Sequence, residues 1–480
     1  MNAWFHSMQR RWCRLALAAL ACLMASWLAQ ARPGGGGGFH GGGSGGFHGG
    51  SHSFSGGGFH SSGLGGGAMF TLPSSCLVTV LVLILVGALL LNIWRRSRQP
   101  AAPAQPRPAA PHVVPANLDA LRQQDPGLSA QGLEARTRRM ADILREAWCA
   151  GDMRPARAFV SDGVFCRFSV QLELMRAHGE RNVMADAAVD AVTIVGAERA
   201  DPFEFVRVRV DAHARDLMVP YAATAEQVAK ALHGAANEPY SEIWSLVRCQ
   251  GAKTKPEHGH VGISCPSCGA PLGEGEVIQC RYCHALVNSG EFDWVLAEIT
   301  QLSVWRPAAL KEVPGFSRLH AADPGLAVAA MEDRASSLFW KWIEAGAKGS
   351  PAPLRKCSTT AFRNAIPAPP ALHEVAVGGV DLVACGAAGE PGGMDQAEVK
   401  VRWSGAARPG EEGRYLEHVL RLVRRAGVQS KPSFSSLVCH ACGAPLTASD
   451  SDQCDHCHAE VATGEQSWVL DGVLAGRPDW

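Results

Sequence analysis

Eight of the sixteen cysteines fall into two identical patterns. Each pattern is a Cys-x-x-Cys pair, eleven intervening residues and a second Cys-x-x-Cys pair. Two thiolate pairs on tight turns supply the four soft ligands that a tetrahedral zinc ion takes, and four protein ligands leave no open position for catalysis. The sequence therefore predicts two structural zinc ions, one held by Cys265, Cys268, Cys280 and Cys283 and one by Cys439, Cys442, Cys454 and Cys457.

Two other interpretations of these cysteines are open. His284 and His458 directly follow the second pair of each module, and C-x-x-C-H is also the attachment signature of c-type haem, which would make the chain a dihaem electron carrier. Haem attachment does not need the upstream cysteine pair, however, and the histidine can equally be the turn residue after the second pair. Two disulfides per module are the other alternative, and they require an oxidising compartment.

Composition and motifs limit the classes of function. The 45 basic and 45 acidic residues balance, and the cysteine modules are acidic, so they lack the cations that phosphate binding needs. We therefore expect no nucleic-acid partner.

The sequence shows no Ser-His-Asp order, phosphate-binding loop or dinucleotide fingerprint, and we do not expect an enzyme. An enzyme or a small apolar-ligand binder that uses a pocket in the first α+β domain is the alternative, because a pocket's polar lining can be scattered in sequence.

The first 117 residues read as targeting and spacer segments. They are a signal peptide over 1–31, a Gly/Ser/Phe/His-rich disordered tail over 32–68, a transmembrane helix over 69–94 and a Pro/Ala-rich linker over 95–117. Small residues at Ala29 and Ala31 mark the expected cleavage site. Because Arg95 and Arg96 follow the apolar run directly, the positive-inside rule places the tail outside the bacterial inner (cytoplasmic) membrane and the C-terminal domains in the cytoplasm.

The remainder of the chain is an internal duplication. Asp125-Pro126-Gly127-Leu128 recurs as Asp323-Pro324-Gly325-Leu326, and Lys255-Pro256 recurs as Lys431-Pro432. Each copy is predicted to be a larger domain followed by a cysteine module. The expected ranges are 118–258 and 261–300 for the first copy, and 318–432 and 435–474 for the second, diverged copy.

Periodicity predicts the elements that position the modules. Apolar residues at helical spacing from Leu133 to Trp148 predict an amphipathic helix that ends at Gly151, and Ser161 is placed to cap a second helix. Val206 to Val210 alternates with charged residues, as a half-buried strand does. Because the helices precede the strands, we expect an α+β fold with helices packed on a curved antiparallel sheet.

The first larger domain resembles bacterial members of the Tim forty-four-like family. The resemblance rests on Ile143 to Met153, on the Val206 to Val210 strand and on Glu242-Ile243-Trp244, with the strand ending at Arg248. It covers 118–258 well and 318–432 poorly. The family includes the peripheral anchor of the mitochondrial import motor and a mitochondrial ribosomal protein. The resemblance implies a cone-shaped fold like that of nuclear transport factor two, and roles near membranes in protein translocation or assembly.

These observations predict a membrane-anchored, cytoplasm-facing binding or scaffold protein with an unknown protein partner. A cluster of arginines is also a candidate surface for anionic lipid headgroups. An ordinary solvated helix face is the alternative for the same residues. The cluster comprises Arg136, Arg138, Arg139, Arg145, Arg154 and Arg157.

Overall fold

The computed structural model describes residues 116–255, 261–273, 277–303, 305, 312–390, 392–409, 411, 413–446 and 451–476. All of them belong to one compact unit. The predicted signal peptide, Gly-rich tail and transmembrane helix, and the linker up to residue 115, lie outside the described residues. Among the helices that are described, none has the length and apolarity to cross a bilayer.

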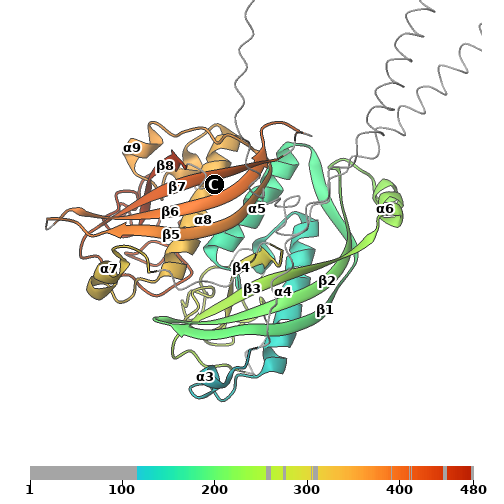
Figure 1. The fold of residues 1–480 in the computed structure, drawn as a ribbon, viewed down its shortest axis with the longest axis horizontal. Helices are drawn as coiled ribbons and strands as arrows, with labels where there is room; N and C mark the ends of the chain where they lie inside the picture. The colour runs from blue at the N-terminus through green and yellow to red at the C-terminus, as the bar shows by residue number, and fades with distance from the viewer. Residues whose placement is uncertain are drawn as a thin grey trace, which may run out of the picture. The chain divides into compact units, whose positions relative to one another are not determined.

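The first half contains helices followed by a four-stranded sheet (Figure 1). The strands pair antiparallel in the order β1-β2-β3-β4. The elements are α3 (Asp119–Arg122), α4 (Ala130–Ala150), η2 (Arg154–Ala156), α5 (Asp162–Ala177), β1 (Glu180–Ala200), β2 (Phe203–Pro220), α6 (Ala225–Gly234), β3 (Asn237–Cys249) and β4 (Val295–Gln301).

The second half repeats this plan with shorter elements. Its strands also pair antiparallel, in the order β5-β6-β7-β8. The elements are α7 (Phe316–Ala322), α8 (Val328–Lys348), η4 (Ala352–Leu354), α9 (Thr360–Arg363), β5 (His373–Gly386), β6 (Met394–Ala406), β7 (Arg414–Arg425) and β8 (Val469–Ala475). The prediction of an α+β protein built on antiparallel sheets is confirmed.

Local sequence signals explain where the first elements begin and end. The Ser129 hydroxyl accepts from the Gly132 amide at the start of α4, and Gly151 ends that helix in the left-handed conformation with φ of 69°. The Ser161 hydroxyl accepts from the Val164 amide at the start of α5, as predicted. In β2, the side chains from Val206 to Val210 alternate between buried and half-buried positions, so one face of the strand packs against the helices.

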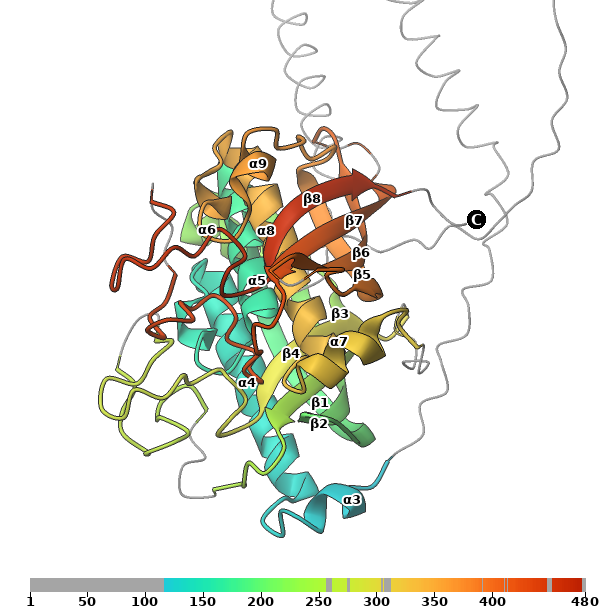
Figure 2. The same ribbon diagram turned by 90° about the vertical axis from the view of Figure 1, so that its left-hand side faces the viewer.

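The cysteine modules are insertions within the sheets. The chain leaves β3 at Cys249, forms the first module, and returns as β4, which pairs with β3. The second module lies in the same way between β7 and β8. Figure 2 shows both modules on the same side of the molecule. This differs from the predicted order of a complete domain followed by a module, because the ranges 261–300 and 435–474 each include residues of the fourth strand.

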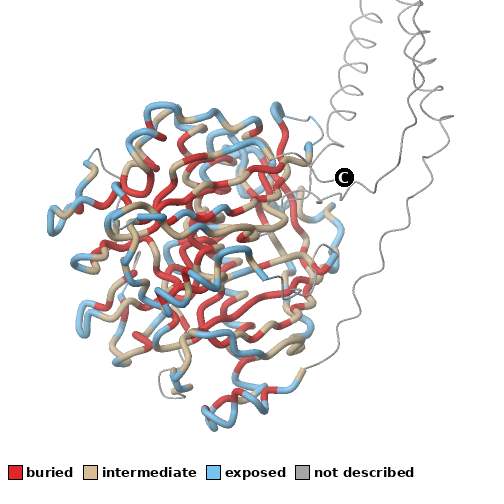
Figure 3. The backbone as a smooth tube through the Cα atoms, turned by 60° about the vertical axis from the view of Figure 1, so that its left-hand side comes forward, coloured by how far each residue is buried: buried red, intermediate tan, exposed pale blue. Residues whose placement is uncertain are grey.

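The two faces of α5 belong to different hydrophobic cores. Phe168 and Leu172 pack with α4 and the first sheet, whereas Val170 and Leu174 pack with α8 and the second sheet. Gly163 permits the close approach to α8, because a Cβ atom there would lie 2.5 Å from the Asp333 carboxylate. In the second half, the position of α5 is taken by α9, which has only four residues. The helix of the first half therefore completes the core of the second, and buried segments run through both halves (Figure 3).

Each half contains the same buried ion pair. Arg248 at the end of β3 pairs with Asp125 at 2.8 Å, and Arg424 at the end of β7 pairs with Asp323, also at 2.8 Å. Each guanidinium also lies over an indole ring that precedes the fourth strand, 4.3 Å from the Trp294 centroid in the first half and 4.7 Å from that of Trp468 in the second. The two halves that repeat in sequence therefore also share the same buried ion pair and ring contact in the structure.

Candidate metal centres and neighbouring cavities

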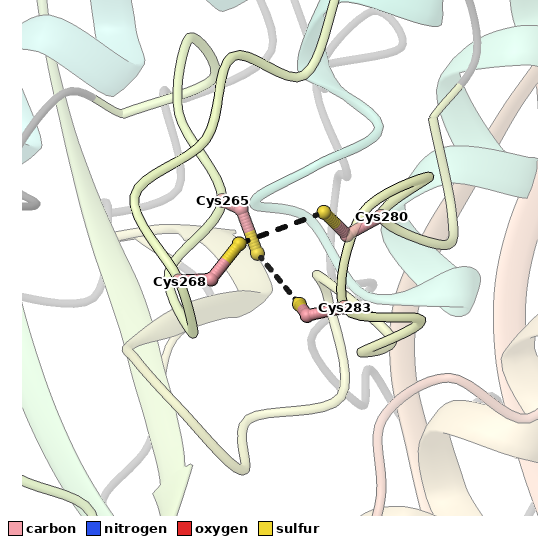
Figure 4. A group of neighbouring side chains, drawn as sticks. All are labelled: Cys265, Cys268, Cys280 and Cys283. Atoms are coloured by element: carbon pink, nitrogen blue, oxygen red, sulfur yellow. Dashed lines mark hydrogen bonds between the residues drawn. The ribbon is translucent and has the colours of Figure 1, made fainter.

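The eight predicted metal ligands converge as two groups of four. Within each group, all four Sγ atoms lie within 4.8 Å of one another. In the first group Cys265 Sγ lies 3.7 Å from Cys283 Sγ and Cys268 Sγ lies 3.8 Å from Cys280 Sγ (Figure 4). Both corresponding distances in the second group are 3.7 Å. A tetrahedral ion with metal–sulfur bonds of about 2.3 Å separates its sulfurs by about 3.8 Å, so each group fits a four-thiolate zinc or iron site.

Each Cys-x-x-Cys pair lies on a tight backbone turn. In the first turn, the Gly269 amide donates to the carbonyl of Cys265 at 2.9 Å, and in the second, the His284 amide donates to that of Cys280 at 2.9 Å. Gly269 and His284 have φ of 75° and 60°. Gly443 and His458 repeat these turns in the second module. The residue after each pair therefore has a left-handed backbone, which glycine adopts freely and histidine more readily than most residues.

The first group combines buried and exposed sulfurs. Cys265 and Cys280 are buried, whereas Cys268 and Cys283 are exposed. Burial raises the pKa of Cys265 to about 12. The backbone N–H of Ala285 lowers the pKa of Cys283 to about 7. Metal binding to the group displaces protons from the thiols, because the thiolate is the ligand.

The geometry gives no support to the disulfide and haem alternatives. All thirteen cysteines in the described part of the chain are free, and the 3.7 Å between paired sulfurs is far longer than a disulfide bond of about 2.05 Å. All four sulfurs of a module face one point, whereas haem attachment uses only the second pair. His284 and His458 are exposed turn residues.

Charged side chains hold the modules against the helical layer. Lys255 Nζ donates to the Ser267 carbonyl of the first turn at 3.1 Å. On the helix side, Arg136 of α4 pairs with Asp293 at 2.8 Å. In the second half, Lys356 pairs with Asp455 at 2.6 Å and Arg363 with Asp452 at 2.7 Å. A metal ion in either module would therefore stabilise contacts that extend to the helices.

The six arginines proposed for lipid binding do not share one free surface. Arg157 is buried and pairs with Asp162, and Arg136 pairs with Asp293. The others that have acidic partners are Arg138 with Glu134, Arg145 with Asp142 and Arg154 with Asp152. Arg139 is exposed on α4. Most of this cationic charge is thus balanced within the chain.

One cavity between the helices and the sheet of the first α+β domain is small. It has a volume of about 40 Å³ and is lined by Phe168, Tyr240 and Trp244, among others. The Trp244 indole donates to Glu242 at 2.9 Å, so this acid already has a partner in the cavity wall. A space of this size admits about one or two water molecules.

A larger cavity lies between α8 and the second cysteine module. It has a volume of about 390 Å³, and its lining includes Arg334, Arg424 and Lys431. A second one, of about 510 Å³, separates α4 from the first module, where Arg139, Ile143 and Ile263 line it. Sequence reasoning missed both, because their walls combine short segments that are far apart along the chain.

The sequence also did not predict a buried carboxylate pair where the two halves meet. Asp162 at the start of α5 accepts from the amides of Ser436 and Leu437. Asp333 of α8 accepts from the Gly163 amide at 3.2 Å. Burial raises the pKa of Asp333 to about 8. No local pattern signalled this pair, because Asp162 and Asp333 are far apart in sequence and meet only where α5 packs on α8.

Comparison with known proteins gives little further information. No protein-family model matches the chain, and no curated protein matches it. Among solved structures, a chain described as "Ntf2 like protein involved in plasmid conjugation" is similar at 7% sequence identity, with 72% of this chain and 96% of that chain covered and a TM-score of 0.15. At that TM-score, the likeness supports no argument about fold or function.

Proposed function

We propose that this protein is a metal-stabilised binding or scaffold protein, anchored in the bacterial inner membrane through residues 69–94 with its two α+β domains in the cytoplasm. The metal is zinc, one ion in each cysteine module. The observation that carries the proposal is the convergence of four cysteines, and of no His, Asp or Glu among the described residues, between the third and fourth strands of each sheet. A closed thiolate site of this kind stabilises structure and does not catalyse.

The role in membrane-associated protein translocation or assembly rests on the resemblance of residues 118–258 to the Tim forty-four-like family.

Metal content of the full-length protein, purified from membranes in detergent, tests the proposal. We expect two zinc ions per chain. The Cys268→Ser/Cys283→Ser variant should contain one, and the corresponding Cys442→Ser/Cys457→Ser variant should also contain one, because the modules are separate. Cys149→Ser, outside the modules, is the matched control and should retain two. Covalent haem, or a metal-free chain with oxidised thiols, would contradict the proposal.

Membrane orientation needs a separate experiment. A reporter that fluoresces only in the cytoplasm, fused after residue 480, should be active in intact cells. Activity of a periplasmic reporter at the same position would contradict the cytoplasmic placement, whatever the metal content.

A further inference from the structure

The carboxylate of Asp293 in the first half has no counterpart in the second half, where the equivalent residue is Ser467. Arg136 and Arg334 occupy equivalent positions, because each donates to the carbonyl of the tryptophan before the fourth strand, at 2.9 Å and 3.0 Å. In the first half, the preceding residue Asp293 pairs with Arg136 at 2.8 Å. In the second half, that position is Ser467. Among the described residues, Arg334 donates its hydrogen bonds to the carbonyl oxygens of Trp468 and Ser436.

The guanidinium of Arg334 is both buried and adjacent to a cavity. The residue is 4% exposed, and it lines the space of about 390 Å³ between α8 and the second module. A buried charge is costly unless a charge or hydrogen bonds compensate it. Within the described residues, its hydrogen bonds use three of the five N–H groups that a guanidinium carries. The remaining two N–H groups make no hydrogen bond among the described residues, and the Asp162 and Asp333 carboxylates interact with the guanidinium only through space.

The rest of the cavity wall has a complementary chemistry. No Asp or Glu lines it and Lys431 adds a second positive charge, while Cys439 and Cys442 of the second metal group form another part of the wall. Arg424 also lines the cavity, but Asp323 balances its charge at 2.8 Å. The buried hydroxyl of Ser435 has no hydrogen-bond partner among the described residues. Leu326, Met331 and Val438 form an apolar part of the wall.

We propose that this cavity binds a small organic anion. Its carboxylate or phosphate group pairs with Arg334 and takes the place that the Asp293 carboxylate occupies in the first half, and its apolar part packs against the wall formed by Leu326, Met331 and Val438. A volume of about 390 Å³ lies within the range of small-molecule sites. The proposal concerns the second half and holds whichever metal the modules contain.

Calorimetric titration of the zinc-loaded full-length protein tests this site. The probes are benzoate and phenyl phosphate, with benzamide as the uncharged control and inorganic phosphate as the head group alone. We expect saturable binding of benzoate, phenyl phosphate or both, and none of benzamide. The tighter of the two anions identifies the head group. If neither anion binds at millimolar concentration, the proposal is wrong.

Two variants locate the binding. Ser467→Asp supplies the carboxylate of the first half, so it should weaken probe binding about 10- to 100-fold while the protein stays folded. Arg334→Gln should weaken binding to a similar extent, and Arg136→Gln, at the equivalent position without the cavity, should not. Probe binding by Ser467→Asp at wild-type affinity would overturn the proposal.

Metal content of each variant separates this site from the metal centre, because Cys439 and Cys442 also line the cavity. We expect two zinc ions in Ser467→Asp. If Arg334→Gln loses the second zinc ion and the wild type binds neither anion, Arg334 balances the thiolate charge instead, and the anion site does not exist.

Discussion

His284 and His458 show how a single residue can suggest the wrong chemistry. Both follow a Cys-x-x-Cys pair and complete a haem-attachment string. Both also have φ of 60°, in the position where Gly269 and Gly443 stand after the first pairs. Their conformation explains them as turn residues, because histidine is one of the few non-glycine residues enriched in the left-handed region.

We therefore predict that His284→Gly/His458→Gly keeps two metal ions per chain and folds at least as stably as the wild type, since glycine adopts a positive φ without steric cost. Metal analysis and thermal unfolding measure both. Gly269→Val provides the opposite control, because a β-branched residue in the left-handed region is strained and should weaken the first site. Loss of metal from the histidine variant would show that the side chains take part in binding.

Asp333 and its neighbour Glu332 are acids whose ionisation opposes folding, because burial raises the pKa of each to about 8. The pKa of Asp333 rises in the folded protein from a usual value of 3.8. Between about pH 4 and pH 8, the folded state therefore binds a proton that the unfolded state does not. The contribution of Asp333 to the free energy of unfolding therefore falls as pH rises through this range, by at most about 1.4 kcal/mol per pH unit.

Asp333→Asn should remove this contribution, because the amide stays neutral and its oxygen can still accept from the Gly163 amide. We expect the stability of the variant relative to the wild type to increase from pH 5 to pH 8. Denaturant unfolding at several pH values measures the difference. Asp142→Asn, at an exposed position on α4, should show no such trend. An equal pH dependence in wild type and Asp333→Asn would contradict the assignment.

At the scale of elements, each cysteine module ends where the fourth strand begins. Trp294 lies over Arg248 of β3 at the end of the first module, and Val295 pairs with Val247 of β3 directly afterwards. The module therefore sets where β4 enters the sheet. Metal binding to such a site is coupled to folding. We therefore expect loss of the metal to destabilise the pairing of the edge strand β4 with β3.

We predict that Cys268→Ser/Cys283→Ser increases amide hydrogen exchange in β4 (Val295–Gln301) by about tenfold or more, since local opening of the module releases this strand. Exchange in β8, which follows the intact second module, should change little. Mass spectrometry of peptides from both strands makes the comparison within one sample. If the variant has lost its first metal ion and β4 remains fully protected, the module does not hold the strand.

At the scale of the whole molecule, the two halves share helix α5. Val170 and Leu174 belong to the core of the second half although they lie in the first, and the Gln171 side-chain amide donates to the Val375 carbonyl of β5 at 3.0 Å. The duplicated halves are thus not two independent domains. The shorter second copy depends on a helix of the first.

Leu174→Ala should destabilise the protein by about 2–5 kcal/mol, as expected for a cavity in a packed core. Because both cores contain α5, the two halves should unfold in one transition, which tryptophan fluorescence and circular dichroism should report at the same temperature. Glu173→Ala, an exposed neighbour on the same helix, should change stability by no more than about 0.5 kcal/mol. Two separate transitions would show that the halves fold independently.

The sequence by itself determined features that depend on neighbouring residues. Periodic apolar residues defined α4, the hydroxyl of Ser161 and the backbone freedom of Gly151 marked helix ends, and alternating valines defined β2. The spacing of the cysteines determined the two groups of four, because each pair lies within one turn and the eleven-residue separation brings the pairs together.

Contacts between segments that are far apart in the sequence became known only from the tertiary structure. The insertion of each module between two paired strands, the α5 contact with α8 and the cavity beside Arg334 all join residues whose proximity no local pattern encodes. The physical reason is that spacing and periodicity constrain one turn or one face of an element. Which faces meet depends on how the whole chain buries its apolar surface, and here the shortened α9 left a place in the second half that α5 fills.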